Sequence, residues 1–172
     1  MSGDRSFTVD LGATGVAAEF SDQRSAANPL PTDLVDSLIS AVTSTLEGEG
    51  VASGSVDLIA VDLETITELN AQHMGHEGPT DVLSFPLDDP SEGESFGFRP
   101  HIGDIVVCAE VAASQAPDHA GSLEAELHLL VIHSALHLLG HDHVEDTGRL
   151  KMQAREKAHL RRFGFSHPGD QR

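Results

Sequence analysis

The chain has 172 residues, 39% of them hydrophobic, which fits one domain over residues 1–172 with a core of its own. No apolar run approaches the roughly 18 residues that a membrane span needs, and the N-terminus lacks the apolar core of a secretion signal. The single cysteine, Cys108, excludes an internal disulfide. We therefore expect a cytoplasmic protein without a membrane partner.

The charge is strongly acidic, because 28 Asp and Glu against 10 Lys and Arg give a net charge of −18. Such a balance opposes general attraction to the phosphates of nucleic acids. Seven of the ten basic residues nevertheless lie within the last 24 positions. This cluster has two interpretations, a solvated helix face or a local basic patch on an acidic molecule.

Hydrophobic spacing predicts the elements of the first half of the chain. Residues 1–28 are rich in small and polar residues, and we expect this segment to be either flexible or strand-containing, with Phe7 to Leu11 as its one candidate strand. Apolar residues recur at helical spacing from Leu34 to Leu46, with Thr32 or Asp33 placed to cap the helix. The elements expected next are a strand at 56–61, a helix at 64–73 and a strand at 81–85.

The second half begins with an acidic, Gly-rich segment at 88–100, which predicts a surface loop. A long apolar helix is expected from Ser122, its cap, to about Leu139, where Gly140 ends it. The fold class predicted is α+β, with a small sheet and several packed helices. The other elements expected are a strand at 102–108, a short helix at 109–115 and a last, basic helix at 147–163.

Three histidines in the long helix and the turn after it have the spacing of a metal site. His133 and His137 are four residues apart, so their imidazoles share one helix face. Gly140 lets the chain leave the helix and return, which brings His143 toward the same point. Three neutral histidines leave one position of a tetrahedral zinc ion open for water, as in catalytic zinc. We predict one zinc ion per chain, with the metal-bound water as the reactive group.

Residues around this pattern have more than one interpretation. Asp142 either orients an imidazole through its second ring nitrogen or forms the turn. His128, His159 and His167 do not fit the ligand spacing, and we interpret them as structural. His141 does not fit the ligand spacing either, and we favour a structural role for it, with substrate contact as the alternative.

The same spacing occurs in the metzincin proteases, which place a glutamate directly after the first histidine as general base. Here that position is Ser134, whose hydroxyl cannot accept a proton at neutral pH. Glu126 lies about two helical turns back, too far to substitute. A peptidase is therefore a distant alternative. Phosphodiester hydrolysis tolerates the missing base better, because it draws heavily on electrostatic stabilisation by the metal.

Three segments in series resemble one family. The segments 133–143 (HSALHLLGHDH), 78–86 (GPTDVLSFP) and 103–111 (GDIVVCAEV) resemble motifs of the bacterial YbeY endoribonucleases, in matching order over roughly residues 55–165. The resemblance implies an α+β fold with a mixed sheet and a metal site on the long central helix and the following turn. It also implies a metal-dependent endoribonuclease specific for single-stranded RNA.

The implied role is maturation of ribosomal RNA, especially at the 3′ end of the small-subunit RNA, and ribosome quality control. The partners implied are ribosomal RNA and the small subunit or its assembly factors. A second hypothesis is a ribosome-associated assembly factor whose zinc is chiefly structural. The negative net charge favours that alternative, and so does Met74.

The chain departs from the family pattern at three positions. Ser134 replaces a glycine and His141 replaces a tyrosine. Met74 stands where many members carry an arginine thought to contact RNA phosphate. Arg99 and the basic C-terminal helix are candidates to replace that contact.

Within the segment 78–86, Asp81 and Ser84 are candidates to line a cleft beside the metal. The alternative is a strand start for Asp81 and a core-facing hydroxyl for Ser84, which we favour for Ser84. Phe85 and Phe96 are candidates for stacking on bases. Core positions suit them better in a chain with only seven aromatic residues.

Overall fold

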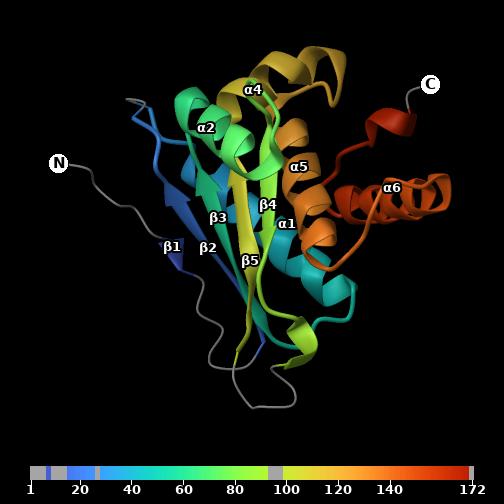
Figure 1. Cartoon of the computed structure of the whole chain (residues 1–172). Coiled ribbons are helices and arrows are strands. Elements are labelled where there is room, and N and C mark those ends of the chain that lie inside the picture. Colours follow the sequence, from blue (N-terminus) through green and yellow to red (C-terminus); the bar gives the residue numbers. More distant parts are fainter. Residues whose placement is uncertain (1–6, 9–14, 26–27, 93–98, 171–172) are drawn as a thin grey trace.

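The computed structural model describes residues 7–8, 15–25, 28–92 and 99–170. Its strands form one mixed sheet in the order β1-β2-β3-β5-β4 (Figure 1). The three inner strands β2, β3 and β5 run parallel, and the edge strands β1 and β4 are antiparallel to their neighbours. The strands are β1 (Phe7–Thr8), β2 (Val16–Asp22), β3 (Gly54–Ala60), β4 (Val82–Pro86) and β5 (His101–Val107).

One face of the sheet is covered by two long helices, with a further helix packed outside them (Figure 1). The helices are α1 (Thr32–Gly48), α2 (Leu63–Met74), α4 (Ala109–Gln115), α5 (Leu123–Leu138) and α6 (Asp146–Arg161), with 3-10 turns η1 (Ala116–Asp118) and η2 (Pro168–Asp170). Side chains from α1, α5 and the strands form the main core. A smaller cluster around Ile66 and Leu83 lies on the opposite face, beneath α2. The α+β class and the mixed sheet are thus confirmed.

The helix α5 is apolar on nearly all sides because it is packed on nearly all sides. It contacts α1, α4, α6 and the strands β4 and β5. Its N-terminus is capped as the sequence predicts, since the Ser122 hydroxyl accepts a hydrogen bond from the Ala125 N–H at 3.1 Å. A rigid, buried helix of this kind holds the two histidines near its C-terminal end in fixed positions.

The sequence interpretation of the first 28 residues is wrong in one respect. β1 lies within the expected strand, but the chain also forms β2 at Val16–Asp22, where no strand was expected. Small residues such as Ala17 and Ala18 have weak β propensity, so the segment does not look like a strand. Pairing with β3 along seven residues supplies the order that local propensity lacks. Residues 9–11 of the expected first strand, and Phe96, lie outside the described residues.

The cap of α1 also differs from the expectation. Pro31 occupies the N-cap, and no side chain caps this end of the helix. Thr32 and Asp33 lie inside the first turn, where the Asp33 carboxylate complements the positive end of the helix dipole. The other predicted elements are present within a few residues of their expected bounds. No helix in the described part of the chain is long and apolar enough to cross a bilayer.

Candidate metal centre

The C-terminus of α5 turns the chain back on itself through a glycine cap. Gly140 has φ of 91°, in the left-handed region that favours glycine. Its N–H donates to the His137 carbonyl at 3.0 Å, and the His141 N–H donates to the Leu136 carbonyl at 3.1 Å. This pair of bonds is a Schellman motif. It sends the following residues back along the end of the helix, as the sequence predicts.

The three predicted ligands are brought together by this turn, and we call them the histidine triad: His133, His137 and His143. One ring nitrogen from each lies within 4.8 Å of the others. The Nε2 atoms of His133 and His137 are 3.0 Å apart. His133 and His137 are half-buried and His143 is exposed, so the site opens to solvent on the side of the turn.

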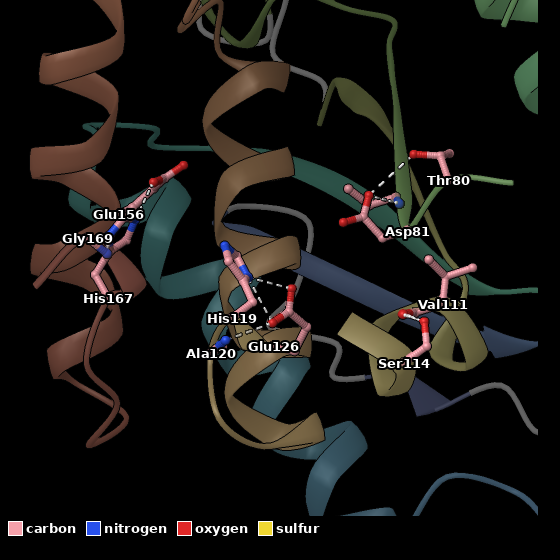
Figure 2. Close-up of polar contacts among 11 residues, drawn as sticks. Thr80, Asp81, Val111, Ser114, His119, Ala120, Glu126, Glu156, His167 and Gly169 are labelled. Carbon is pink, nitrogen blue, oxygen red and sulfur yellow. Dashed lines mark hydrogen bonds and ion pairs between the residues drawn. The ribbon is translucent and has the colours of Figure 1, made fainter. Parts of the chain in front are cut away.

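A buried glutamate on α6 fixes the first ring of the triad. His133 donates from Nδ1 to Glu156 Oε1 at 2.5 Å, which directs its Nε2 toward His137. The other oxygen, Oε2, accepts from His167 Nε2 at 2.9 Å (Figure 2). The His167 Nδ1 in turn accepts from the Gly169 N–H at 2.9 Å. Both oxygens of the Glu156 carboxylate therefore accept hydrogen bonds. If the two histidine rings are neutral, the group as a whole carries the negative charge of Glu156.

Two pKa values in this network are perturbed in directions that suit a cation. Burial alone would raise the pKa of Glu156, but hydrogen bonds from His133 and His167 hold it at about 2. Burial lowers the pKa of His137, and the neighbouring rings of His133 and His143 lower it further. An ionised glutamate and a neutral imidazole are the states in which a metal ligand and its hydrogen-bond partner work.

The triad fits zinc by its chemistry and its spacing. Two nitrogens bound to one tetrahedral zinc ion at about 2.1 Å are about 3.4 Å apart, close to the observed 3.0 Å. Three imidazoles and an anionic carboxylate behind one of them form the usual carboxylate–histidine–metal arrangement. The donor set thus matches zinc with one coordination position left for solvent or substrate.

Beside the triad lies a cavity of about 360 Å³, which we call the triad cavity. His133 and His143 line it from the metal side, and Glu156 and His167 from α6. Its remaining polar lining consists of Asp81, His119, Arg149 and Gln153. Asp81, whose role the sequence leaves open, therefore faces this cavity, while Oδ1 also accepts from the Val82 N–H at 2.8 Å. Neither Ser84 nor Arg99 is part of the lining.

The other sequence candidates have structural partners. Asp142 accepts from the Val144 N–H at 2.8 Å, so it forms the turn. His141 Nε2 lies 3.4 Å from a Glu49 carboxylate oxygen, and the same carboxylate accepts from His159 at 2.8 Å. His128 is buried between the Glu124 carbonyl and the Ser37 hydroxyl. The structural interpretation of His128 and His159 agrees with these contacts.

The basic C-terminal helix is largely engaged by its own neighbours. Arg149 pairs with Asp146 at 2.8 Å, and Lys157 pairs with Asp170 at 2.7 Å. The Arg162 guanidinium donates to the Ser44 carbonyl at 3.3 Å. The helix is therefore closer to a solvated, paired face than to an open basic patch. Arg149 differs from the rest, because it also lines the triad cavity.

Met74 and Phe85, both considered for RNA contact, differ in their exposure. Met74, at the end of α2, is 55% exposed, so an apolar side chain stands on the surface there. Phe85 packs against the smaller core cluster and meets His73 edge-on, with ring centroids 5.1 Å apart. The core interpretation of Phe85 is thus confirmed.

Sequence reasoning missed Glu156, His167 and the role of Gly148. Glu156 and His167 lie 23 and 34 positions after His133, and no spacing rule links them to the triad. A Cβ at Gly148 would lie 2.6 Å from the Asp142 carbonyl oxygen, so the absence of a side chain lets α6 approach the ligand turn. The signal available in the sequence was an acidic residue in the middle of a helix whose other charged residues, after Asp146, are basic.

Known proteins resemble this chain over most of its length. A family profile described as Endoribonuclease YbeY matches residues 20–164. A protein of that name from Salinispora tropica is 41% identical over 127 residues, covering 69% of this chain and 81% of its own. Another from Alkaliphilus metalliredigens is 36% identical over 145 residues, covering 84% of this chain and 94% of its own.

A solved structure agrees with these relatives. The solution structure of TM1509 from Thermotoga maritima matches with a TM-score of 0.55 and 31% identity, covering 77% of this chain and 83% of that one. The family profile covers well over half of the chain, and it includes the triad, Glu156 and the three sequence motifs. The chain therefore belongs to the YbeY family of metal-dependent endoribonucleases.

Proposed function

We propose that the protein is a zinc-dependent endoribonuclease that cuts single-stranded RNA during maturation of ribosomal RNA in the cytoplasm. The 3′ end of the small-subunit RNA is the proposed cleavage region, with ribosome quality control as the wider role. The observation that carries the proposal is the convergence of His133, His137 and His143 beside an open cavity, in a chain of this family. One zinc ion per chain is the proposed stoichiometry.

The triad holds the metal, and the surrounding residues keep the triad in place. When bound, zinc lowers the pKa of a coordinated water and neutralises charge on a phosphoryl oxygen. Glu156 fixes the ring orientation of His133, and the cap at Gly140 fixes the approach of His143. Arg149, on the cavity wall, is placed to contact an RNA phosphate if it leaves its exposed partner Asp146.

Ser134 separates this chemistry from that of a peptidase. Its side chain is fully buried in α5, and its hydroxyl has no hydrogen-bond partner within the described residues. No carboxylate therefore takes the place of the metzincin base at this position. Glu126, the nearest acidic residue earlier on the buried face, is committed to His119 and Ala120.

The proposal is tested by zinc analysis paired with cleavage of an end-labelled single-stranded RNA. We expect about one zinc per chain, cleavage that stops on chelation, and recovery when zinc is restored. An RNA duplex of the same sequence serves as the control for strand specificity and should remain largely uncut. Metal-free protein that cleaves as fast as zinc-loaded protein would refute the zinc-dependent mechanism.

The second candidate is an assembly factor whose zinc is chiefly structural. The net charge of −18 and the exposed Met74 favour it, because both weaken the grip on RNA. A Met74→Arg variant separates the two candidates. For a nuclease we expect tighter RNA binding, a steeper salt dependence by about one phosphate contact, and faster cleavage at low RNA concentration. Tight binding to ribosomal particles with no cleavage by either protein would instead support the assembly factor.

A further inference from the structure

A second histidine system, separate from the triad, lines the triad cavity. His119 follows η1 and precedes α5, and its side chain is 48% exposed. It shares the cavity with His133 and His143. It does not belong to the triad, and its position in the sequence carries no ligand spacing.

The ring of His119 is held by a carboxylate that is completely buried. Nδ1 donates to Glu126, with Oε1 at 2.9 Å and Oε2 at 3.0 Å (Figure 2). Oε2 also accepts from the Ala120 N–H at 3.1 Å, which ties the loop to the first turn of α5. Among the described residues, no group hydrogen-bonds Nε2 of His119. The ring is therefore fixed on one side and free on the other.

Burial makes this pair more than a loop anchor. The Glu126 side chain is 0% exposed, and a buried carboxylate is costly unless a charge-compensating partner accompanies it. If residue 126 served only to anchor the loop, it would need to accept just one hydrogen bond, from the Ala120 N–H. The side-chain oxygen of a neutral glutamine would also accept that bond. The His119 ring supplies the charge-compensating partner, and about half of its side chain remains exposed. The same pattern, a buried carboxylate orienting Nδ1 while Nε2 faces substrate, orients acid–base histidines in hydrolases.

We propose that His119 is the proton donor to the leaving oxygen of the phosphodiester, and that Glu126 is its positioning residue. This inference rests on the proposed function. A zinc ion held by the triad would activate a water molecule and stabilise the phosphoryl charge, but it would leave the departing alkoxide without a proton donor. Outside the triad, the described lining of the cavity offers one imidazole nitrogen without a hydrogen-bond partner, Nε2 of His119, and it suits this task.

The step balances with groups of the protein and water alone. The oxygen of a water molecule forms a bond to phosphorus, and the bond from phosphorus to the ester oxygen breaks with its electrons passing to that oxygen. The Nε2–H of the His119 imidazolium gives its proton to the departing oxygen, so one RNA fragment leaves as an alcohol. The attacking water loses a proton to solvent, and the neutral ring regains one from solvent.

The test compares His119→Gln and Glu126→Gln with matched controls. His76→Gln removes an exposed histidine that does not line the cavity, and Glu124→Gln removes an exposed carboxylate from the same turn of α5. Cleavage is measured on single-stranded RNA and on bis(4-nitrophenyl) phosphate, whose leaving group departs without protonation. Zinc content, melting temperature and binding of a non-cleavable RNA are measured on every variant.

We expect His119→Gln to lower kcat on RNA by about 10²–10⁴-fold, the usual worth of a positioned acid. Its loss on the nitrophenyl ester should be at least tenfold smaller, with zinc content and RNA binding unchanged. Glu126→Gln should lower kcat in the same direction by a smaller factor. Unchanged RNA cleavage by His119→Gln would overturn the proposal, as would an equal loss on both substrates.

A measurement on metal-free protein tests the pair without turnover. In proton–nitrogen NMR of the imidazoles, His119 should carry its proton on Nδ1 in wild-type protein, and the Glu126→Gln variant should lose that signal or shift it. A His119 ring protonated only on Nε2 would overturn the assignment. Wild-type protein that binds zinc but never cleaves RNA would refute the nuclease function itself, whereas equal cleavage by wild type and His119→Gln would refute only the role of His119.

Discussion

Two regions of the molecule gather side chains that metals commonly bind, and the chain holds them in different ways. The histidine triad lies at the end of α5. The second region, which we call the carboxylate–histidine group, consists of Asp57, His101 and Asp104 on neighbouring strands β3 and β5. In both, three potential ligand atoms lie within 4.8 Å of one another.

The difference is in what already satisfies those atoms. In the carboxylate–histidine group, His101 Nε2 donates to Asp104 at 2.8 Å and lies 3.8 Å from Asp57, while Nδ1 is bonded to the Ser55 hydroxyl at 3.1 Å. In that group, the hydrogen bonds of the histidine ring are made within the group and to the neighbouring serine. The triad turns three imidazoles toward one point, and its carboxylate stands behind the ligands rather than among them. Metal-binding residue types that merely lie close together are therefore a weaker sign of a metal site. The stronger sign is a set of ligand atoms that point to one place and are oriented by residues behind them.

The largest effect is expected from removing one ligand of the triad. His137→Ala leaves two imidazoles, too few to hold zinc in a site with three protein ligands. We expect loss of stoichiometric zinc and of RNA cleavage, measured by elemental analysis after dialysis and by the labelled-RNA assay. His101→Ala is the matched control from the carboxylate–histidine group and should retain one zinc. If both variants lost zinc equally, the conclusion that only the triad binds zinc would be wrong.

A smaller effect is expected from the carboxylate behind the triad. Glu156→Gln keeps the size of the side chain but removes the charge that His133 and His167 share. We expect zinc affinity to fall about 10–100-fold, as for other partners of metal-bound histidines. Competition with a chromogenic chelator gives the affinity, and the exposed Glu145→Gln provides the control. An unchanged affinity would mean that the ring of His133 is positioned by packing alone.

The contrast also explains which parts of the site could be predicted from sequence. The i, i+4 spacing of His133 and His137 and the glycine turn before His143 are local, so periodicity and backbone conformation are sufficient. Glu156 and the His119–Glu126 pair depend on how α6 and η1 pack against α5, which no local rule specifies. Asp142 is also local, because a turn-forming role was one of its two interpretations and its carboxylate accepts from the Val144 N–H.

The fold divides in a similar way. The helix α5 and the strand β5 follow from strong local patterns, and the cap at Ser122 was predictable from its residue type. The strand β2 was not, because its Ala-rich sequence gains order only by pairing with β3. The row formed by Glu19, Asp57 and Asp104 across three strands likewise exists only through strand register.

Because α6 lies close to the ligand turn, replacing Gly148 should change the stability of the protein, and the sign of that change shows whether the turn can move. By helix propensity alone, Gly148→Ala should stabilise the protein by up to about 1 kcal/mol. The new Cβ would instead lie 2.6 Å from the Asp142 carbonyl, so we expect destabilisation of about 1–3 kcal/mol and a several-fold weaker affinity for zinc. Thermal unfolding of metal-free protein and chelator competition measure the two effects. A stabilised variant with unchanged affinity would show that the ligand turn adjusts freely.

The smallest effect is expected in the carboxylate–histidine group. Burial raises the pKa of Asp57, and although His101 lowers it, the nearby Asp104 and Glu19 raise it further. A raised carboxyl pKa means that the folded state binds the proton more tightly than the unfolded state, so this residue costs stability as the pH rises above its usual titration range. Asp57→Asn should therefore stabilise the protein at pH 7, by no more than about 0.5 kcal/mol for so exposed a position. The gain should shrink toward pH 4 in thermal unfolding.

Asp104→Asn provides the comparison for that measurement, because Asp104 is the direct partner of His101. Its replacement should lower the melting temperature at pH 7, opposite in sign to Asp57→Asn. Opposite signs at two carboxylates on adjacent strands are expected because Asp104 has a direct hydrogen bond to His101, whereas Asp57 is repelled by its acidic neighbours. If zinc or manganese instead raised the melting temperature of the His137→Ala variant, and Asp104→Asn abolished that rise, the carboxylate–histidine group would itself bind a metal.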